Sequence, residues 1–369
     1  MAENLVSIKS INIKNYKSIV DTTIQLGGFN VFIGANGCGK SNILEAIALG
    51  AAASCDKLDY EYFGNRGIRI VSVPMMLPAF EGIESDGVTL LLSDNEGNNL
   101  SFYIYFDKTA KPAKWKAMFD TKSIELDSIR KIIKENGLSQ KYTLKVINND
   151  DFLERFIIYS AEESIIRRSD DSNKTYPLGL HGEGLFAYLK DLSQRSNAVG
   201  FFNELKENLS VFDWFDDIEI PNGQLSNEFN IVLKDSYLDE TLSAFDQRST
   251  NEGFLYLLFY LTLIISYETP KFFAIENIDS SFNPKLCREV IKRLIVLAQK
   301  HGKQIIATTH NPSVLDGLDL SDDDVRLFTI RRGIDGDTKA SRVTLKERLT
   351  IPLSEAWQRG YLGGLPDNF

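Results

Sequence analysis

The sequence predicts an α/β fold in which a glycine-rich loop joins a buried strand to a helix. Three observations support this prediction: the loop itself, the apolar run before it and the helical spacing after it. The loop is Gly34-Ala-Asn-Gly-Cys-Gly-Lys-Ser41, the apolar run is Val31–Ile33, and the helix covers 42–49. A strand, a glycine-rich loop and a helix in this order are the context that a phosphate-binding loop requires.

The eight loop residues match the pattern G-x-x-x-x-G-K-[ST] of the P-loop. Glycine lets the backbone N–H groups converge on phosphate oxygens, and the following helix N-terminus adds partial positive charge. We expect Lys40 to reach the β- and γ-phosphates and the Ser41 hydroxyl to bind Mg²⁺. The expected nucleotide-binding residues are Gly34, Ala35, Asn36, Gly37, Cys38, Gly39, Lys40, Ser41 and Asn42. A glycine-rich turn with an incidental lysine is the alternative, and the flanking elements disfavour it.

Length and composition limit the possible classes of protein. A chain of 369 residues suggests about two domains, or one large domain with an insertion. No apolar run is long enough for a membrane span, and no secretory signal is visible at the start of the chain. The three scattered cysteines are typical of a reduced cytoplasm, so we expect a cytoplasmic protein with no membrane contact. The net charge of −10 disfavours a surface that binds nucleic acid broadly.

One segment, Lys108 to Lys145, departs from this acidic character. It contains ten basic and four acidic residues, a local balance of +6. Such a segment forms either a solvated helical face or an arm that contacts nucleic acid or an acidic partner. Both interpretations stay open at this point.

Three predicted strands precede the loop, over 5–13, 19–26 and 29–33, and the polar turn Asn15-Tyr-Lys-Ser18 joins the first two. A further hairpin is expected over 88–92 and 100–106. This arrangement resembles the ATP-binding-cassette heads of RecF, SMC and OLD-type proteins, which begin with a strand, an N-[FY]-[KR]-S turn and a strand. The resemblance implies that Asn15 and Lys17 contribute to nucleotide binding.

The second half of the expected site starts at a buried strand over 271–275, which ends at Glu276. A Walker B carboxylate belongs at this position, so Glu276 is expected to bind Mg²⁺ together with Ser41. The stretch from Glu276 to Pro284 resembles the D-E-P-E-x-G-L-H-P motif of OLD-like and RecF-like ATPases. In that comparison Asn277 replaces the catalytic glutamate. An amide can orient water but accepts no proton, so either hydrolysis is slow or Asp279 assists.

Two further motifs follow the same resemblance. The strand over 304–309 leads into His310, which resembles the switch histidine that hydrogen-bonds the γ-phosphate. The stretch Arg248-Ser-Thr-Asn-Glu-Gly253 opens an apolar helix and resembles the cassette signature, which contacts the nucleotide of the opposite subunit. We therefore expect Asn251, Glu252 and Gly253 to bind nucleotide, although Asn251 stands where serine is usual. No glutamine occurs between Gln25 and Gln140, so Glu162 or Glu163 is the candidate for the Q-loop position.

The resemblance implies a cassette-type ATPase head with a mixed sheet and an antiparallel subsheet. The head is expected over 1–107 and 226–369, with a largely helical inserted region over 108–225. ATP and Mg²⁺ are the implied cofactors, and two heads should sandwich two ATP molecules in a homodimer or a higher homo-oligomer. The aromatic tail over 357–369 either packs on its own head or docks a partner.

Two functions are compatible with these features. The first is an ATP-driven switch that controls a separately encoded nuclease or toxin, as in bacterial defence against phage. The second is a RecF-like or SMC-like DNA-repair ATPase that clamps DNA directly. The acidic chain favours the first function, and the basic segment 108–145 supports the second.

Overall fold

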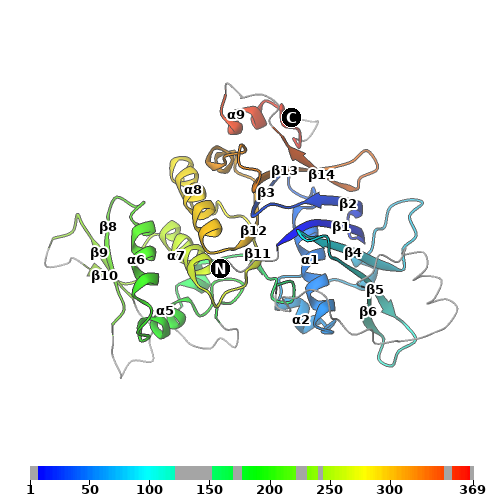
Figure 1. Ribbon diagram of the computed structural model, residues 1–369, viewed down its shortest axis with the longest axis horizontal. Helices are drawn as coiled ribbons and strands as arrows, with labels where there is room; N and C mark the ends of the chain where they lie inside the picture. The colour runs from blue at the N-terminus through cyan, green and yellow to red at the C-terminus, as the bar shows by residue number, and fades with distance from the viewer. Residues whose placement is uncertain are drawn as a thin grey trace.

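The computed structural model describes residues 7–120, 152–168, 177–221, 231–239, 244–344 and 351–365. Two large sheets form the centre of the molecule, and helix α1 lies between them (Figure 1). Helices α7 and α8 cover the other face of the mixed sheet. Among the described helices, none is long and apolar enough to cross a membrane.

The mixed sheet has the strand order β14-β13-β3-β12-β11-β7, in which β14 alone is antiparallel to its neighbour. Every residue of β3, β11 and β12 is buried, because helices cover both faces of these central strands. The strands are β3 (Phe29–Ile33), β7 (Ile158–Tyr159), β11 (Phe272–Ile275), β12 (Gln304–Thr309), β13 (Val325–Arg332) and β14 (Thr338–Val343).

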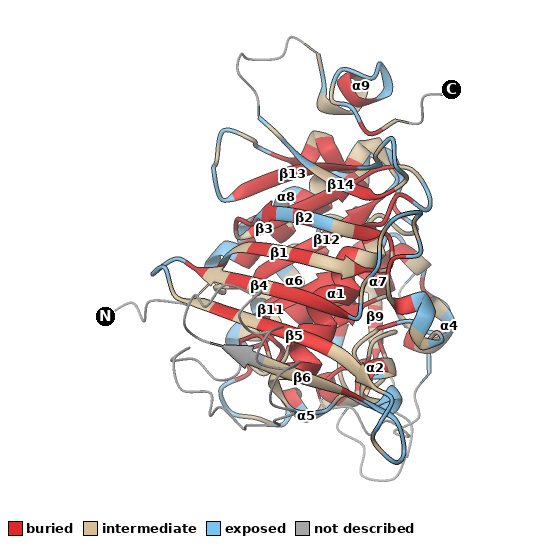
Figure 2. Cartoon of the chain, turned by 90° about the vertical axis from the view of Figure 1, so that its right-hand side faces the viewer, coloured by how far each residue is buried: buried red, intermediate tan, exposed pale blue. Residues whose placement is uncertain are grey.

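The second sheet is antiparallel, with the order β2-β1-β4-β5-β6. Figure 2 shows β1, β4 and β5 side by side, with buried residues along much of their length. Its strands are β1 (Ile8–Tyr16), β2 (Ile19–Gln25), β4 (Gly87–Asp94), β5 (Asn99–Asp107) and β6 (Lys114–Asp120). A small third sheet is formed by β8 (Phe215–Glu219), β9 (Val232–Asp235) and β10 (Ala244–Phe245).

The helices divide the interior into two apolar clusters. One cluster contains α1 and the residues of both sheets that face it, and the other contains α5 to α8 and the opposite face of the mixed sheet. The helices are α1 (Lys40–Ser54), α2 (Tyr60–Gly64), α4 (Glu163–Ile166), α5 (Leu185–Ser193), α6 (Val199–Leu209), α7 (Glu252–Ile265), α8 (Pro284–Lys300) and α9 (Leu353–Gln358). The described residues also form the 3₁₀ helices η1 (Val73–Met76) and η3 (Pro312–Gly317).

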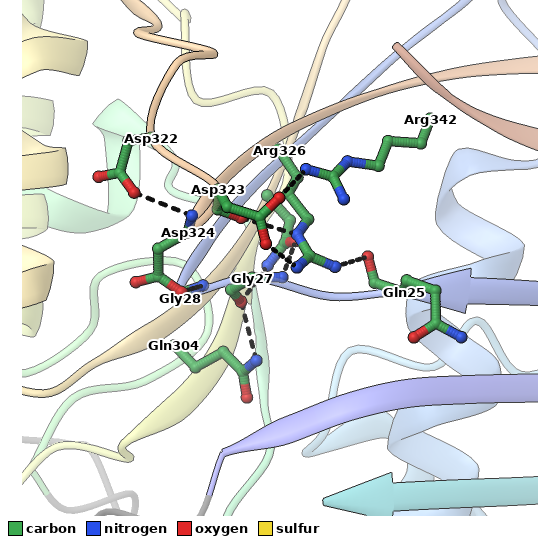
Figure 3. Close-up of polar contacts among 10 residues, drawn as sticks. Gln25, Gly27, Gly28, Gln304, Asp322, Asp323, Asp324, Arg326 and Arg342 are labelled. Atoms are coloured by element: carbon green, nitrogen blue, oxygen red, sulfur yellow. Dashed lines mark hydrogen bonds and ion pairs between the residues drawn. The ribbon is translucent and has the colours of Figure 1, made fainter. Parts of the chain in front are cut away.

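Buried polar side chains join the two large sheets at the start of β3. The Gln304 amide donates to the carbonyl oxygens of Ile8 and Gly27, both at 2.8 Å, and its oxygen accepts from the Ile8 N–H at 3.0 Å. The Gln304 side chain therefore continues the backbone pairing from β12 to β1. On the other side of β3, the Asp324 carboxylate accepts from the Gly28 N–H at 2.6 Å (Figure 3).

Two arginine residues add further polar contacts near the start of β3. Arg326 donates to the Gln25 carbonyl at 2.9 Å, and Asp323 receives hydrogen bonds from both Arg326 and Arg342 (Figure 3). The backbone must pass very close to Asp324, since a Cβ added at Gly28 would lie 2.3 Å from that carboxylate. The neighbouring Gly27 is constrained by backbone, since its added Cβ would lie 2.4 Å from the Asp324 carbonyl oxygen.

The structure confirms the predicted α/β fold, the three strands before the loop and the hairpin of β4 and β5. The helical alternative for the basic segment is wrong over Lys114–Asp120, which form β6. Polar and apolar residues alternate at its start, where Trp115 is buried between two lysines. A period of two is typical of a strand. The rest of the segment, 121–145, lies outside the described residues.

The expected inserted region, 108–225, contributes to both large sheets. Strand β6 pairs with β5, and β7 pairs with β11, while α4, α5 and α6 supply its helical part. The division of the chain at 107 and 226 stays a prediction. Near the C-terminus, α9 packs on η3, and Trp357 belongs to the apolar cluster around α7. Residues 351–365 thus pack on their own head.

We predict that Gln304→Leu lowers the free energy of unfolding by about 3 kcal/mol, because the buried Ile8 N–H and carbonyl lose their Gln304 partner. The Gly27 carbonyl loses one of two donors and keeps the Asn30 amide at 2.9 Å. Urea denaturation followed by circular dichroism measures the change. Gln299→Leu is the matched control, since Gln299 is exposed and donates to Asp322 at the surface. Equal urea midpoints for the two variants would contradict the role of Gln304 as a link between the sheets.

Candidate active site

A polar cavity of about 380 Å³ lies at the carboxyl ends of the parallel strands, beside the N-terminus of α1. Its volume is within the range of small-molecule sites. Side chains that follow β3, β11, β12 and β13 reach it because the carboxyl ends of parallel strands share one edge of a sheet. The cavity is lined by Asn36, Gly37, Cys38, Gly39, Lys40, Ser41, Asn42, Arg69, Glu276, Asn277, Thr308, His310 and Arg332.

The glycine-rich loop has the backbone shape that phosphate binding needs. Gly37 and Gly39 have φ values of 73° and 108°, in the left-handed region that side chains disfavour. Gly39 is also packed tightly, since an added Cβ would lie 2.0 Å from the Thr338 hydroxyl oxygen. Helix α1 begins directly afterwards at Lys40, so its N-terminal N–H groups face the cavity.

Lys40 folds back over the loop that precedes it. Its Nζ donates to the carbonyl oxygens of Gly34 at 2.9 Å and Ala35 at 3.2 Å. Burial lowers the pKa of Lys40, while Cys38 and the nearby carboxylates of Glu276 and Asp279 oppose this shift. The ammonium group is thus held at the cavity by neutral carbonyls, and it is available to pair with a phosphate.

The two residues predicted to bind Mg²⁺ meet in the structure. The Ser41 hydroxyl donates to the Glu276 carboxylate, which follows β11 directly. A hydroxyl and a carboxylate suit Mg²⁺, which takes oxygen ligands and keeps several waters and phosphate oxygens. When bound there, the ion would neutralise phosphate charge, and Ser41 and Glu276 are the residues that would hold it.

Asn277 and Asp279 follow Glu276 in a tightly turned loop. Asn277 has a φ of 53°, and its N–H donates to the Thr308 hydroxyl at 3.0 Å. Its side chain lines the cavity beside Glu276. Asp279 accepts a hydrogen bond from the Thr309 hydroxyl at 2.6 Å and does not line the cavity. Asn277 is therefore the nearer of the two to a bound nucleotide.

His310 faces the cavity from the end of β12, with its Nδ1 3.4 Å from the Lys40 Nζ. Partial burial, followed by the charge of Lys40, lowers the pKa of His310. Both effects favour the neutral imidazole over the charged form. A neutral ring can donate one hydrogen bond to a phosphate oxygen without adding a second positive charge next to the lysine.

Three residues that line the cavity belong to no sequence motif and were not predicted. Arg69 donates through Nη2 to the Asn42 side chain at 3.0 Å, and Arg332 donates through Nε to the Gly37 carbonyl at 2.9 Å. Thr308 comes two residues before His310 on the same strand. Arg332 ends β13, so its position at a strand end was the one available signal, whereas nothing in the sequence distinguishes Arg69.

Several predicted residues lie outside the cavity of their own chain. Lys17 pairs with the Glu45 carboxylate, and Asn15 lies in the same turn with a φ of 62°. Residues 251–253 form the start of α7, where the Asn251 side chain accepts from the Phe254 N–H at 2.8 Å. The Q-loop candidates also point elsewhere, since Glu162 pairs with His181 and Glu163 with Arg167.

The fold is similar to that of solved SMC heads. One is the crystal structure of the SmcHead bound to the C-winged helix domain of ScpA, with a TM-score of 0.57 and 14% identity, covering 92% of this chain and 98% of that chain. Another is the Smc head domain with an extended coiled coil, bound to the C-terminal domain of ScpA derived from Pyrococcus furiosus. It has a TM-score of 0.55 and 13% identity over 96% and 98% of the two chains.

The sequence is also similar to a curated protein, the chromosome partition protein Smc of Methanocaldococcus jannaschii. The two are 29% identical over 184 residues, which cover 46% of this chain. The chain spans only 15% of that relative's length.

A family model covers the region that builds the site. The family described as "AAA domain, putative AbiEii toxin, Type IV TA system" matches residues 29–316. This match begins at β3 and contains the glycine-rich loop, helix α7, Glu276 and His310. The chain therefore belongs to this family of AAA domains.

Proposed function

We propose that the protein is an ATP-driven switch in which two copies close around two ATP molecules and thereby control a partner effector. The observation that carries the proposal is the division of the site. The loop, Lys40, Ser41 and Glu276 converge on one cavity, whereas the start of α7 lies outside it. A second copy would bring that helix N-terminus, with its partial positive charge, to the γ-phosphate.

The description of the family and the comparison structures support control of another protein. The family's description refers to a toxin system, and two solved heads of similar fold are bound to domains of ScpA. By analogy, we propose that closure of this head controls a separately encoded nuclease or toxin in the cytoplasm, as part of bacterial defence against phage.

The cavity residues suggest slow hydrolysis. The loop N–H groups and Lys40 would hold the β- and γ-phosphates, and the neutral His310 would donate to a γ-phosphate oxygen. Asn277 would orient the attacking water but could not take its proton. A protein with these groups would bind ATP well and remain closed for long periods, which suits a switch more than a motor.

A DNA-clamping ATPase is the second candidate, favoured by the basic segment 108–145. Lys108 and Lys111 lie in the connection between β5 and β6, and Lys114 and Lys116 lie in β6. The remaining basic residues of the segment lie outside the described residues. A DNA titration at several salt concentrations, with and without ATP, separates the two functions. For a switch that acts on a protein partner, we expect weak binding that ATP does not strengthen. Tight, ATP-dependent and salt-sensitive binding would favour the clamp.

We predict that Lys40→Ala weakens ATP binding by about tenfold or more, because a phosphate loses a charge-assisted hydrogen bond. Equilibrium binding of a fluorescent ATP analogue measures this effect. Lys14→Ala is the control, since Lys14 is an exposed lysine that pairs with Asp21 at 2.9 Å. Unchanged binding and hydrolysis by Lys40→Ala would refute the P-loop assignment.

Assembly provides a separate test. We predict that ATP shifts the wild type from monomer to dimer in sedimentation velocity, and that Gly253→Arg prevents the shift. An added Cβ at Gly253 would already lie 3.0 Å from the Ser281 carbonyl, so a long side chain there must project toward the second copy or displace the helix start. Gly200→Arg is the control, because nothing lies within 4 Å of its added Cβ. If ATP does not change the sedimentation of the wild type, the proposed ATP-bound dimer is contradicted.

Turnover tests the role of Asn277. We predict that Asn277→Glu raises the rate of ATP hydrolysis, with an upper limit given by the 10²–10⁴-fold that a general base typically contributes. The gain should be smaller than that limit, because Glu276 repels a second carboxylate and because the φ of 53° suits asparagine better than glutamate.

Asn277→Asp is the matched control, since aspartate tolerates this backbone but has a shorter carboxylate. Glu276→Gln should instead lower the affinity for Mg²⁺. A wild-type turnover above roughly 10 s⁻¹ without any trigger would overturn slow hydrolysis, because that rate is typical of ordinary enzymes.

A further inference from the structure

A short segment connects the Mg²⁺ side of the cavity to the start of α7. Strand β7 pairs with β11, and the Glu276 N–H donates to the Tyr159 carbonyl at 2.8 Å. After β7 the chain continues through α4 to Arg167, a distance of only eight residues. The segment from Tyr159 to Arg167 thus begins beside the predicted metal ligand.

Arg167 ends this segment and binds the loop that precedes α7. Its Nη1 donates to the carbonyl oxygens of Gln247 at 2.7 Å and Arg248 at 3.1 Å, and its Nη2 donates to the Thr250 carbonyl at 2.8 Å. The Glu163 carboxylate accepts from Nε at 2.7 Å and orients the guanidinium from behind. One planar group therefore binds three carbonyls within four residues, a task that suits the fork of donors in arginine.

These carbonyls belong to the residues directly before the signature motif. Thr250 is followed by Asn251, which caps α7. Helix α4 also packs directly against α7. Helix α7 is thus held by α4 both through the Arg167 hydrogen bonds and through this packing.

Packing makes this connection stiff. The His181 ring bonds to the Ser160 carbonyl at 2.8 Å, and the His181 carbonyl accepts from the Glu162 N–H at 3.0 Å. Gly182 lies against α4 so closely that an added Cβ would be 2.3 Å from Ile166. The end of β7 and α4 are thus held by both hydrogen bonds and close packing.

We propose that Arg167 is a positioning residue that holds the N-terminus of α7 in place for the nucleotide bound by a second copy of the chain. The proposal rests on the proposed function, because it requires the two-copy site. Arg167 does not line the cavity of its own chain, so it acts on catalysis only through α7. It also links the two sites, since the segment that presents it starts beside Glu276.

Arg167→Met tests the proposal against Arg168→Met, which removes the same charge from the next, exposed position. We expect both variants to bind a fluorescent ATP analogue as monomers within about twofold of the wild type. ATP-dependent dimerisation should be at least tenfold weaker for Arg167→Met and unchanged for Arg168→Met. Arg167→Lys keeps the charge but lacks the fork, so it should give an intermediate loss. It also serves as the test variant if thermal melting shows that Arg167→Met does not fold.

Mixed dimers, purified through two different affinity tags, test whether Arg167 affects the nucleotide site of the other copy. A dimer of Lys40→Ala with Arg167→Met retains one site with an intact P-loop facing an intact α7, and it should hydrolyse ATP at about half the wild-type rate. A dimer of wild type with the Lys40→Ala, Arg167→Met double variant has an intact P-loop facing an altered α7. Its rate should be at least tenfold lower than that of the first dimer.

The outcomes distinguish this inference from the proposed function. If ATP does not cause the wild type to dimerise, the two-copy switch itself is wrong and the inference is wrong as well. If the wild type associates and Arg167→Met associates equally well, the role of Arg167 is wrong and the switch stands. Equal rates for the two mixed dimers, or a loss of ATP binding by monomeric Arg167→Met, would likewise overturn the positioning role.

Discussion

The phosphate-binding loop keeps its open shape because side chains from both large sheets hold it from behind. The Thr338 hydroxyl donates to the Cys38 carbonyl at 3.0 Å, and the Ser18 hydroxyl lies 2.6 Å from that of Thr338. Arg332 holds the Gly37 carbonyl in the same way. Because these carbonyls accept hydrogen bonds on the side away from the cavity, the N–H groups of the loop can point into the cavity. The site thus depends on the β13–β14 hairpin and on the turn between β1 and β2.

A single buried carboxylate organises the charges on the other side of the loop. Glu45 on α1 is 1% exposed, and it accepts hydrogen bonds from the Tyr16 hydroxyl, Lys17 and Arg69. Three donors offset the cost of burying the charge. Burial and the carboxylate raise the pKa of Tyr16, whereas burial lowers the pKa of Lys17. Because Arg69 also bonds Asn42, this carboxylate helps to hold an arginine at the cavity.

The sequence was sufficient to predict three of the strands that end at the cavity, β3, β11 and β12, because fully buried parallel strands are continuous apolar runs and the glycine loop has a fixed pattern. It did not predict β13, which ends at Arg332. The convergence of Lys40, Glu276 and His310 follows from that topology. Arg69 and Arg332 could not be predicted as cavity residues, since tertiary packing alone brings their segments to the loop. Strand β6 was also missed, because its lysines on the exposed face dominate the composition of the segment and obscure the alternation around Trp115.

The central position of β3 has a consequence for how the chain folds. Its two neighbours in the sheet are β12 and β13, which come almost 300 residues later. At a synthesis rate of 5–20 residues per second, the N-terminal strands wait about 15–60 s for these partners. Contacts of such long range also slow folding itself. The glycine-rich loop therefore gains its neighbours in the sheet only after nearly the whole head has been made, so the cavity is completed late in synthesis.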